Sequence, residues 1–162
     1  MNIIQNKIFL NDKHEFRFIE KPINNSYYSF VQNYNRSGYE QFLINFDTML
    51  EIIQYFLLKY KARIIELELL MNDEEYREDT RFEIEEVNNK NEHFIDFTKY
   101  LRDLYENQNE EINKLCIKYR ENNELFKWHI YMNGLIEIES GNKENIIKDL
   151  RTVIVKNEKV YN

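Results

Sequence analysis

Apolar and aromatic residues recur over residues 39–71 at the spacing of a helix that faces a protein core. Read at steps of seven residues, three adjacent columns are apolar or aromatic at every position except Arg63. The columns are Tyr39, Phe46, Ile53, Tyr60 and Leu67; Phe42, Met49, Phe56, Arg63 and Leu70; and Leu43, Leu50, Leu57, Ile64 and Met71. Ser37 and Glu40 match a capping box at the start. The pattern predicts one long helix over residues 37–71.

A second helical pattern follows a short polar break. Asn72 tolerates the left-handed backbone at a helix end, and Asp73 can cap the next helix, whose first turn is acidic. Apolar residues then recur at heptad spacing from Ile84 to Phe126, with polar interruptions. This predicts a helix over residues 73–124, either continuous or broken at the polar run 88–91. The short connection predicts that the two helices form an antiparallel hairpin.

Both ends of the chain indicate shorter elements. Residues 3–20 alternate around the turn residues Asn11-Asp12, which predicts a β-hairpin. Residues 26–36 are rich in aromatics, and we interpret them as a short helix capped by Ser26, with a packed loop as the alternative. Residues 143–157 have helical spacing, although the β-branched run 153–155 leaves a strand open.

Residues 126–139 contain Asn133-Gly134 between two alternating runs, which indicates a β-hairpin. A three-residue loop, with Gly134 in the left-handed region, pairs Tyr131 with Leu135. One face then carries Trp128, Ile130, Ile136 and Ile138, and the other carries Lys127, His129, Glu137 and Glu139. Because register decides which face is buried, we prefer this loop to a two-residue turn. It predicts that Trp128 is buried and His129 exposed.

These patterns together predict a mainly α fold with a small β part (α+β). A long helical hairpin, residues 37–71 and 73–124, is expected to form the scaffold. Short antiparallel strands from both chain ends pack beside it, and residues 1–162 form a single domain. The expected core of the first helix is Phe46, Ile53, Phe56, Leu57 and Tyr60.

Composition restricts the environment in which the protein works. At 162 residues and 43% hydrophobic composition, the chain is long enough to bury a substantial core. Its lone Cys116 excludes an internal disulfide framework and indicates a reducing, cytoplasmic environment. The N-terminus shows no signal-peptide pattern. The most apolar window, residues 42–58, contains Asp47 and Glu51, which argues against a membrane span.

The net charge of −7 is concentrated in one segment. Residues 66–92 hold eleven acids against three bases, and the remainder of the chain is almost neutral. A compact acidic patch attracts basic surfaces over about a Debye length. The candidate partner-binding residues are Asp73, Glu74, Glu75, Glu78, Asp79, Glu83, Glu85 and Glu86.

The sequence contains no motif typical of a catalytic site. The three glycines are too scattered for a phosphate-binding loop, and the three histidines have no partner at metal-ligand spacing. We therefore predict no catalytic residue, cofactor or metal, and we interpret Cys116 as a small buried apolar residue. The C-terminal helix has a basic excess of only two, so direct binding of nucleic acid is not expected.

The leading hypothesis is a non-catalytic protein-binding module, an acidic inhibitor or adaptor that acts on a basic, nucleic-acid-handling protein. The first alternative is a structural coiled-coil protein that self-associates, for example as a homodimer, through the apolar face of residues 39–71. The second is an enzyme whose active site is assembled only by the fold.

Overall fold

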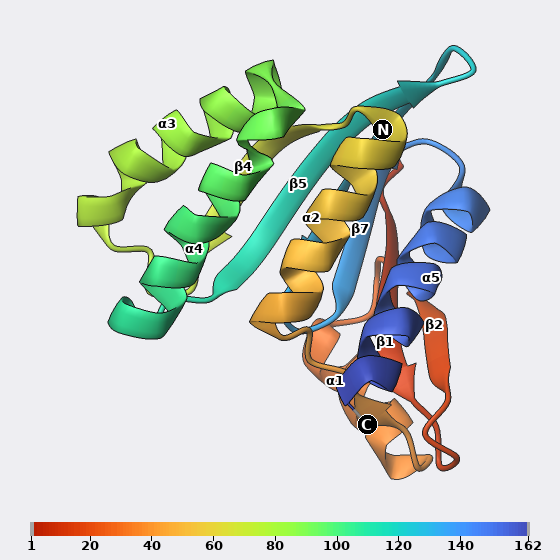
Figure 1. The fold of residues 1–162 in the computed structure, drawn as a ribbon. Helices are drawn as coiled ribbons and strands as arrows, with labels where there is room; N and C mark the ends of the chain where they lie inside the picture. Colours follow the sequence, from red (N-terminus) through yellow and green to blue (C-terminus); the bar gives the residue numbers. More distant parts are fainter. Residues whose placement is uncertain (1, 162) are drawn as a thin grey trace.

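The computed structural model describes residues 2–161, and its central feature is a seven-stranded antiparallel sheet (Figure 1). Six strands follow the order β2-β1-β7-β6-β5-β4, and the short β3 pairs with β1. The strands are β1 (Ile4–Leu10), β2 (Phe16–Lys21), β3 (Glu40–Gln41), β4 (Arg63–Leu69), β5 (Ile112–Glu121), β6 (Glu124–Tyr131) and β7 (Leu135–Ser140). The helices are α1 (Tyr27–Arg36), α2 (Phe46–Tyr60), α3 (Glu74–Asn89), α4 (Phe94–Gln108) and α5 (Lys143–Tyr161), with a short 3-10 turn (Asn91–His93) before α4.

Helices α2 and α5 lie across one face of the sheet and form the main core with it (Figure 1). Phe56 of α2 meets Trp128 of β6 edge to face, with ring centroids 4.8 Å apart, and both side chains are completely buried. At its other end α2 contacts α4, where Phe46 stacks on Tyr105 at 4.4 Å. The hydrophobic core is therefore centred on α2.

The opposite face of the sheet is covered differently. Near the end of β1, helix α1 packs Phe30 and Tyr34 against Phe9, with ring centroids 5.9 and 5.1 Å from the Phe9 ring. Further along, β6 and β7 carry the polar residues Lys127, His129, Glu137 and Glu139 on this face. Because one face is apolar and the other polar, these strands alternate as half-buried antiparallel strands do.

The predicted helical hairpin of residues 37–71 and 73–124 is wrong, and so is the mainly α fold class. Residues 37–71 contain the C-cap of α1, followed by β3, α2 and β4, in place of one helix. Ser37 is the C-cap of α1, and Asn45 caps α2 through a 2.8 Å bond from the Thr48 N–H. Helix α2 ends at Tyr60, and its C-cap Lys61 has a left-handed backbone. The strict alternation over residues 65–69 fits a strand, and the seven-residue columns did not separate the two patterns.

The second predicted helix is also divided. It breaks after Asn89, as the alternative at residues 88–91 anticipated, and Lys90 is extended. Helix α4 ends at Gln108 with the left-handed Asn109 as its C-cap, and residues 112–121 form β5 where a helix was predicted. Left-handed Asn122 and Asn123 then make the tight turn to β6. Asparagine tolerates this conformation better than most residues, so its position in the sequence is a turn signal.

Most local predictions at the chain ends are confirmed. The hairpin at residues 3–20, the Ser26-capped helix and the C-terminal helix are present, and Asp73 caps α3. The pairing of β6 with β7 follows the three-residue loop, with Trp128 buried and Gly134 at φ +85°. The prediction that His129 is exposed is wrong. Its side chain is only 14% exposed, because it contacts Glu139 and Cys116.

Gly134→Ala should lower the free energy of unfolding by more than about 1 kcal/mol, because alanine resists positive φ. A Cβ here would also lie 2.6 Å from the carbonyl oxygen of Phe42. Gly38 has a similar φ of +91°, but a Cβ added there would meet no atom within 4 Å, so Gly38→Ala isolates the backbone cost. Urea denaturation should show the larger loss for Gly134→Ala. Equal losses would contradict the close approach of Phe42.

Candidate functional site

The eight predicted partner-binding residues lie on helix α3 and its N-cap. Asp73 accepts a 3.1 Å hydrogen bond from the Glu75 N–H, and Glu74 and Glu75 occupy the first turn. Acids at these positions are favourable because the N-terminus of a helix carries a partial positive charge. Six of the eight side chains are exposed, and Glu83 and Glu86 are half-buried. The fold therefore brings the whole set together on one helix.

The acids of α3 are hardly compensated by neighbouring cations. Among the described residues, Glu74 forms an ion pair with Arg77 at 3.9 Å, and Glu86 Oε2 lies 3.7 Å from His93 Nε2. Burial, followed by repulsion from Asp96, Glu86 and Asp79, raises the pKa of Glu83. Asp96 belongs to α4, and sequence reasoning did not include it in the patch. The acidic surface thus continues from α3 onto α4.

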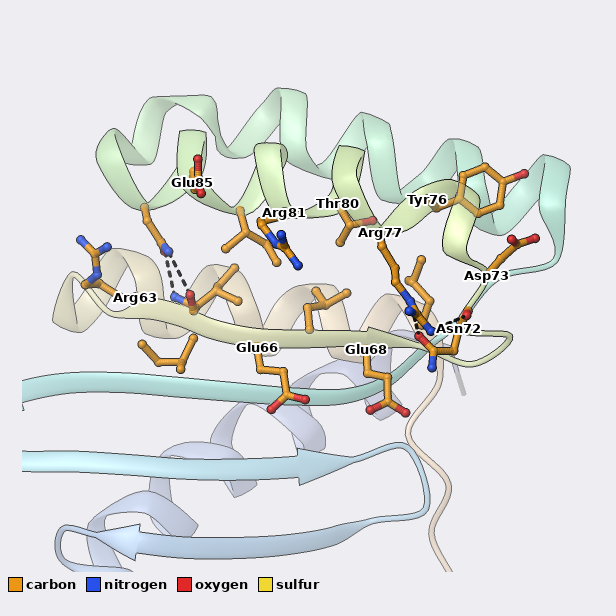
Figure 2. A pocket seen from close by; sticks show the side chains of 16 residues that line it. Arg63, Glu66, Glu68, Asn72, Asp73, Tyr76, Arg77, Thr80, Arg81 and Glu85 are labelled. Atoms are coloured by element: carbon orange, nitrogen blue, oxygen red, sulfur yellow. Dashed lines mark hydrogen bonds between the residues drawn. The ribbon is translucent and has the colours of Figure 1, made fainter.

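Helix α3 presents its arginines on a different side from most of its acids. Arg77 and Arg81 line a groove of about 580 Å³ between α3 and β4 (Figure 2), whereas six of the eight acids lie outside it. Only Asp73 and Glu85 of the predicted set contribute to the groove. The spacing of Arg77 and Arg81, four residues apart on one helix face, was a signal for this segregation. The sequence did not predict the groove itself, because the heptad columns place the residues of β4 in a helix.

Both ends of the groove are closed by hydrogen bonds between α3 and the β4 region. At one end, the Ile64 N–H donates to Asn88 Oδ1 at 2.8 Å, and Asn88 Nδ2 donates to the Ile64 carbonyl at 2.9 Å. At the other end, Arg77 donates to the side-chain and backbone oxygens of Asn72 at 3.3 and 3.4 Å. The close-up in Figure 2 shows both pairs, with β4 running between them.

A second polar cluster lies on the face of the sheet opposite α2. His129 Nε2 is 2.8 Å from Glu139 Oε1 and 3.8 Å from Cys116 Sγ. A nucleophilic triad needs the carboxylate and the thiol on different ring nitrogens, but here they share one. Burial also raises the pKa of the Cys116 thiol to about 11, and Cys116 is only 1% exposed. This geometry does not generate a thiolate nucleophile, and the burial predicted for Cys116 is confirmed.

A third cluster joins α2 to α5. Asp149, which is 7% exposed, accepts hydrogen bonds from Tyr55 and Tyr60 and pairs with Lys59 at 3.1 Å. Burial and then Asp149 raise the pKa of Tyr60 to about 12, so the hydroxyl remains a donor at neutral pH. Both carboxylate oxygens are bonded, and we therefore assign this cluster to packing of the two helices.

Residues 2–161 contain neither a metal-binding cluster nor a membrane-spanning helix. Within this part of the chain, no group of three or more His, Cys, Asp or Glu side chains is arranged to hold a metal ion. None of the helices described there has the length and apolar composition needed to cross a membrane.

Comparison with known proteins adds no assignment. No protein-family model, curated protein or solved structure matches this chain.

Proposed function

We propose that this protein is a non-catalytic protein-binding module whose acidic α3 surface binds a basic partner. The acidic α3 surface denotes the eight residues predicted above: Asp73, Glu74, Glu75, Glu78, Asp79, Glu83, Glu85 and Glu86. The partner is expected to be a protein whose cationic surface handles nucleic acid, because carboxylates can occupy the place of phosphates there. The protein would then act as an inhibitor or adaptor.

The observation that carries this proposal is the concentration of charge on one projecting hairpin. Residues 73–108, which include α3 and α4, hold twelve acids against five bases, so this region accounts for the entire net charge of −7. Helix α3 contacts only α4, the adjoining 3-10 turn and β4 to any extent, and it lies at one end of the sheet (Figure 1). A partner could therefore reach it without disturbing the main core.

Repulsion among these acids favours binding of a cationic surface. Burial is the larger cause of the raised pKa of Glu83, and repulsion from Asp96, Glu86 and Asp79 adds to it, so the charged form is disfavoured in the folded protein. A cationic partner would offset the repulsion between the acids of α3 and α4. A helix face that contacts only solvent would gain no such compensation. Exposed charges act mainly through long-range attraction, so binding should be fast at low salt and weaken as salt is added.

The structure does not contain the helix face through which the alternative, a self-associating coiled coil, would assemble. That coiled coil required a continuous apolar helix face over residues 39–71, and this stretch instead contains α2 between two strands. Most apolar side chains of α2 are already buried against β5, β6 and α5. The groups near Cys116 do not provide a nucleophile, and the proposal therefore includes no chemical step.

Reversing Glu74, Glu75, Glu78 and Asp79 to Lys should weaken binding of the full-length protein to a fluorescent oligolysine. We expect a loss of at least about tenfold, or roughly 1.4 kcal/mol, because four rim contacts each contribute about 0.2–1 kcal/mol and become repulsive. Fluorescence anisotropy titrations between about 50 and about 300 mM salt measure the affinity, and the wild-type affinity should fall steadily over this range.

A matched control carries the same change of charge elsewhere. Asp12, Glu40, Glu124 and Glu144 are all exposed, and their side chains make no hydrogen bond or ion pair among the described residues. Glu144 lies in the first turn of α5, so its reversal also reproduces the unfavourable helix-dipole effect at α3. If this control loses as much affinity as the α3 variant, net charge alone governs binding and the proposed surface is wrong.

A further inference from the structure

Strand β2 is the outermost strand on the side of the sheet away from α3, and it pairs only with β1 (Figure 1). The pairing is regular along the whole strand, from Phe16 opposite Leu10 to Lys21 opposite Gln5, without a register shift. No proline interrupts the strand. Bulges and prolines are two devices that protect a sheet edge from further pairing, and β2 has neither.

Phe18 directs its backbone N–H and C=O away from β1. Ile8 lies opposite Phe18 on β1. Its N–H donates to the Gly134 carbonyl at 2.9 Å, and its carbonyl accepts from the Phe42 N–H at 3.2 Å. Because both bonds lie on the side of β1 away from β2, Ile8 and Phe18 form a non-hydrogen-bonded pair. The backbone groups of Phe18, and of the residues two positions before and after it, therefore face outward.

Phe16, Phe18 and Glu20 thus form a free backbone edge. Among the described residues, no group outside β2 hydrogen-bonds to the outward N–H and C=O groups of these three residues. The Phe16 carbonyl accepts a 3.0 Å bond from the guanidinium of the neighbouring Arg17, which is an exposed side chain of the same strand. A row of unpaired N–H and C=O groups is a template for another strand.

A second copy of this chain fits the edge in one antiparallel register. Only even shifts keep outward-facing residues opposite one another. When Phe18 lies opposite Phe18 of the second copy, Glu15 faces Lys21 at both ends of the new ladder. A slip of two residues in either direction places Arg17 opposite Arg17 or Lys21 of the second copy. Facing positions of opposite charge stabilise paired strands and those of like charge destabilise them, so charge selects the first register.

Two cations beside β2 have no acidic partner within the described part of the chain. Lys21 is only 7% exposed, and its ammonium donates hydrogen bonds to neutral oxygens alone. Arg151 of α5 lies over the Phe18 ring, 5.1 Å from its centroid. In the selected register, Glu15 of the second copy faces Lys21. Glu20 of the second copy lies diagonally across from Phe18, on the side of the sheet that carries Arg151.

We propose that the protein forms a symmetric dimer by antiparallel pairing of β2 with β2 of a second copy. The two-fold axis passes between the two Phe18 residues, and the two sheets join into one continuous sheet. The outward backbone groups supply the pairing, and the Glu15–Lys21 pairs fix the register. This interface is separate from the acidic α3 surface, because α3 contacts β4 and β2 lies at the opposite edge of the sheet.

Multi-angle light scattering of the full-length protein tests the dimer first. The measured mass should be twice the 20.1 kDa of one chain at high concentration and should fall towards one chain on dilution. A monomer at every soluble concentration would overturn the inference. The variant with Lys at Glu74, Glu75, Glu78 and Asp79 should have the same mass, because α3 lies outside the interface. The dimer and the proposed function therefore fail separately, and loss of the dimer in this variant would place the interface on α3.

Glu15→Lys and Lys21→Glu together test the facing charge pairs. Each variant alone places like charges opposite each other at both ends of the ladder, so the dissociation constant of its dimer should rise at least about tenfold. In a mixture of the two variants every facing pair joins opposite charges, and a heterodimer should form. Asp12→Lys is the control, because Asp12 is exposed in the turn before β2 and lies outside the paired residues. An equal loss for this control, or no heterodimer from two folded variants, would contradict the register.

Disulfide cross-linking tests the register without a change of charge at the facing pairs. Phe18→Cys places two thiols at the two-fold axis, where facing Cα atoms are about 5.5 Å apart, a separation that a disulfide can span. Glu20→Cys is the matched control, because its counterpart lies about 13 Å further along the strand. Native Cys116 is only 1% exposed and should stay reduced. Mild oxidation should give a covalent dimer of Phe18→Cys alone, and cross-linking of both variants or of neither would refute the proposed pairing.

Discussion

Phe56→Ala should lower the free energy of unfolding by about 3–5 kcal/mol, the range for truncating an aromatic side chain in a packed core. Phe56 is completely buried in the middle of α2. The centroid of its ring lies 4.8 Å from that of Trp128, 5.6 Å from that of Tyr119 and 5.7 Å from that of Tyr60. Removal of the ring leaves a cavity that these large, interlocked rings cannot fill without leaving their own positions. Guanidinium denaturation measures the loss.

Leu58→Ala is the control for this prediction. Leu58 lies two residues further along the same helix but is 63% exposed, so the loss should stay within about 0.5 kcal/mol. A loss below about 1 kcal/mol for Phe56→Ala would mean that α2 is not the centre of the core.

Lys7→Met should stabilise the folded protein by about 1–3 kcal/mol at neutral pH, because an unpaired buried charge is removed. Lys7 is completely buried, and its Nζ atom has no hydrogen-bond partner among the described residues. Two aromatic faces offset part of the cost, since Nζ lies 5.9 Å from the Phe9 ring and 5.6 Å from the Tyr27 ring. Methionine keeps the length of the stem and contacts the same rings without a charge.

The pH dependence of stability gives an independent check on Lys7. Burial lowers the pKa of Lys7 from 10.5 to about 8, so the folded state releases its proton more easily than the unfolded state does. Between these two pKa values the unfolded state binds more protons, and the free energy of unfolding therefore rises with pH. Wild-type stability should increase by about 2 kcal/mol between pH 7 and about pH 9.5 relative to Lys7→Met. Parallel curves for the two proteins would show that Lys7 is not buried as a charge.

The elements that the sequence predicted correctly are those with a local marker. Gly134 in the β6–β7 loop, Ser26 before α1 and Asp73 before α3 each impose a backbone conformation or fill a cap, and each was placed correctly. The division of residues 37–71 depended on Lys61, because its left-handed backbone separates α2 from β4. Lysine carries no such preference, so only the alternation over residues 65–69 indicated the strand.

Of the candidate site, the acidic surface was predictable from the sequence, but the groove was not. The density of acids over residues 73–86 located the charged surface, because charge is a property of the sequence itself. The groove depends on β4 standing at the sheet edge and on Asn88 reaching Ile64 across twenty-four residues of chain. Such an arrangement follows from strand order, which local patterns do not determine. The contribution of Asp96 from α4 was missed because it requires the turn at Lys90.

Site-directed photo-crosslinking tests the central claim, that the acidic α3 surface binds a basic partner, most directly. Benzoylphenylalanine replaces Glu78 on α3 in one full-length variant and Glu144 on α5 in the control, since both residues are exposed. After irradiation in an extract of the producing cell, mass spectrometry identifies the captured proteins. We predict that position 78 captures a basic protein that position 144 does not, and that capture decreases as salt rises, because long-range charge attraction is screened. Identical capture from both positions, or capture that is insensitive to salt, would contradict the account.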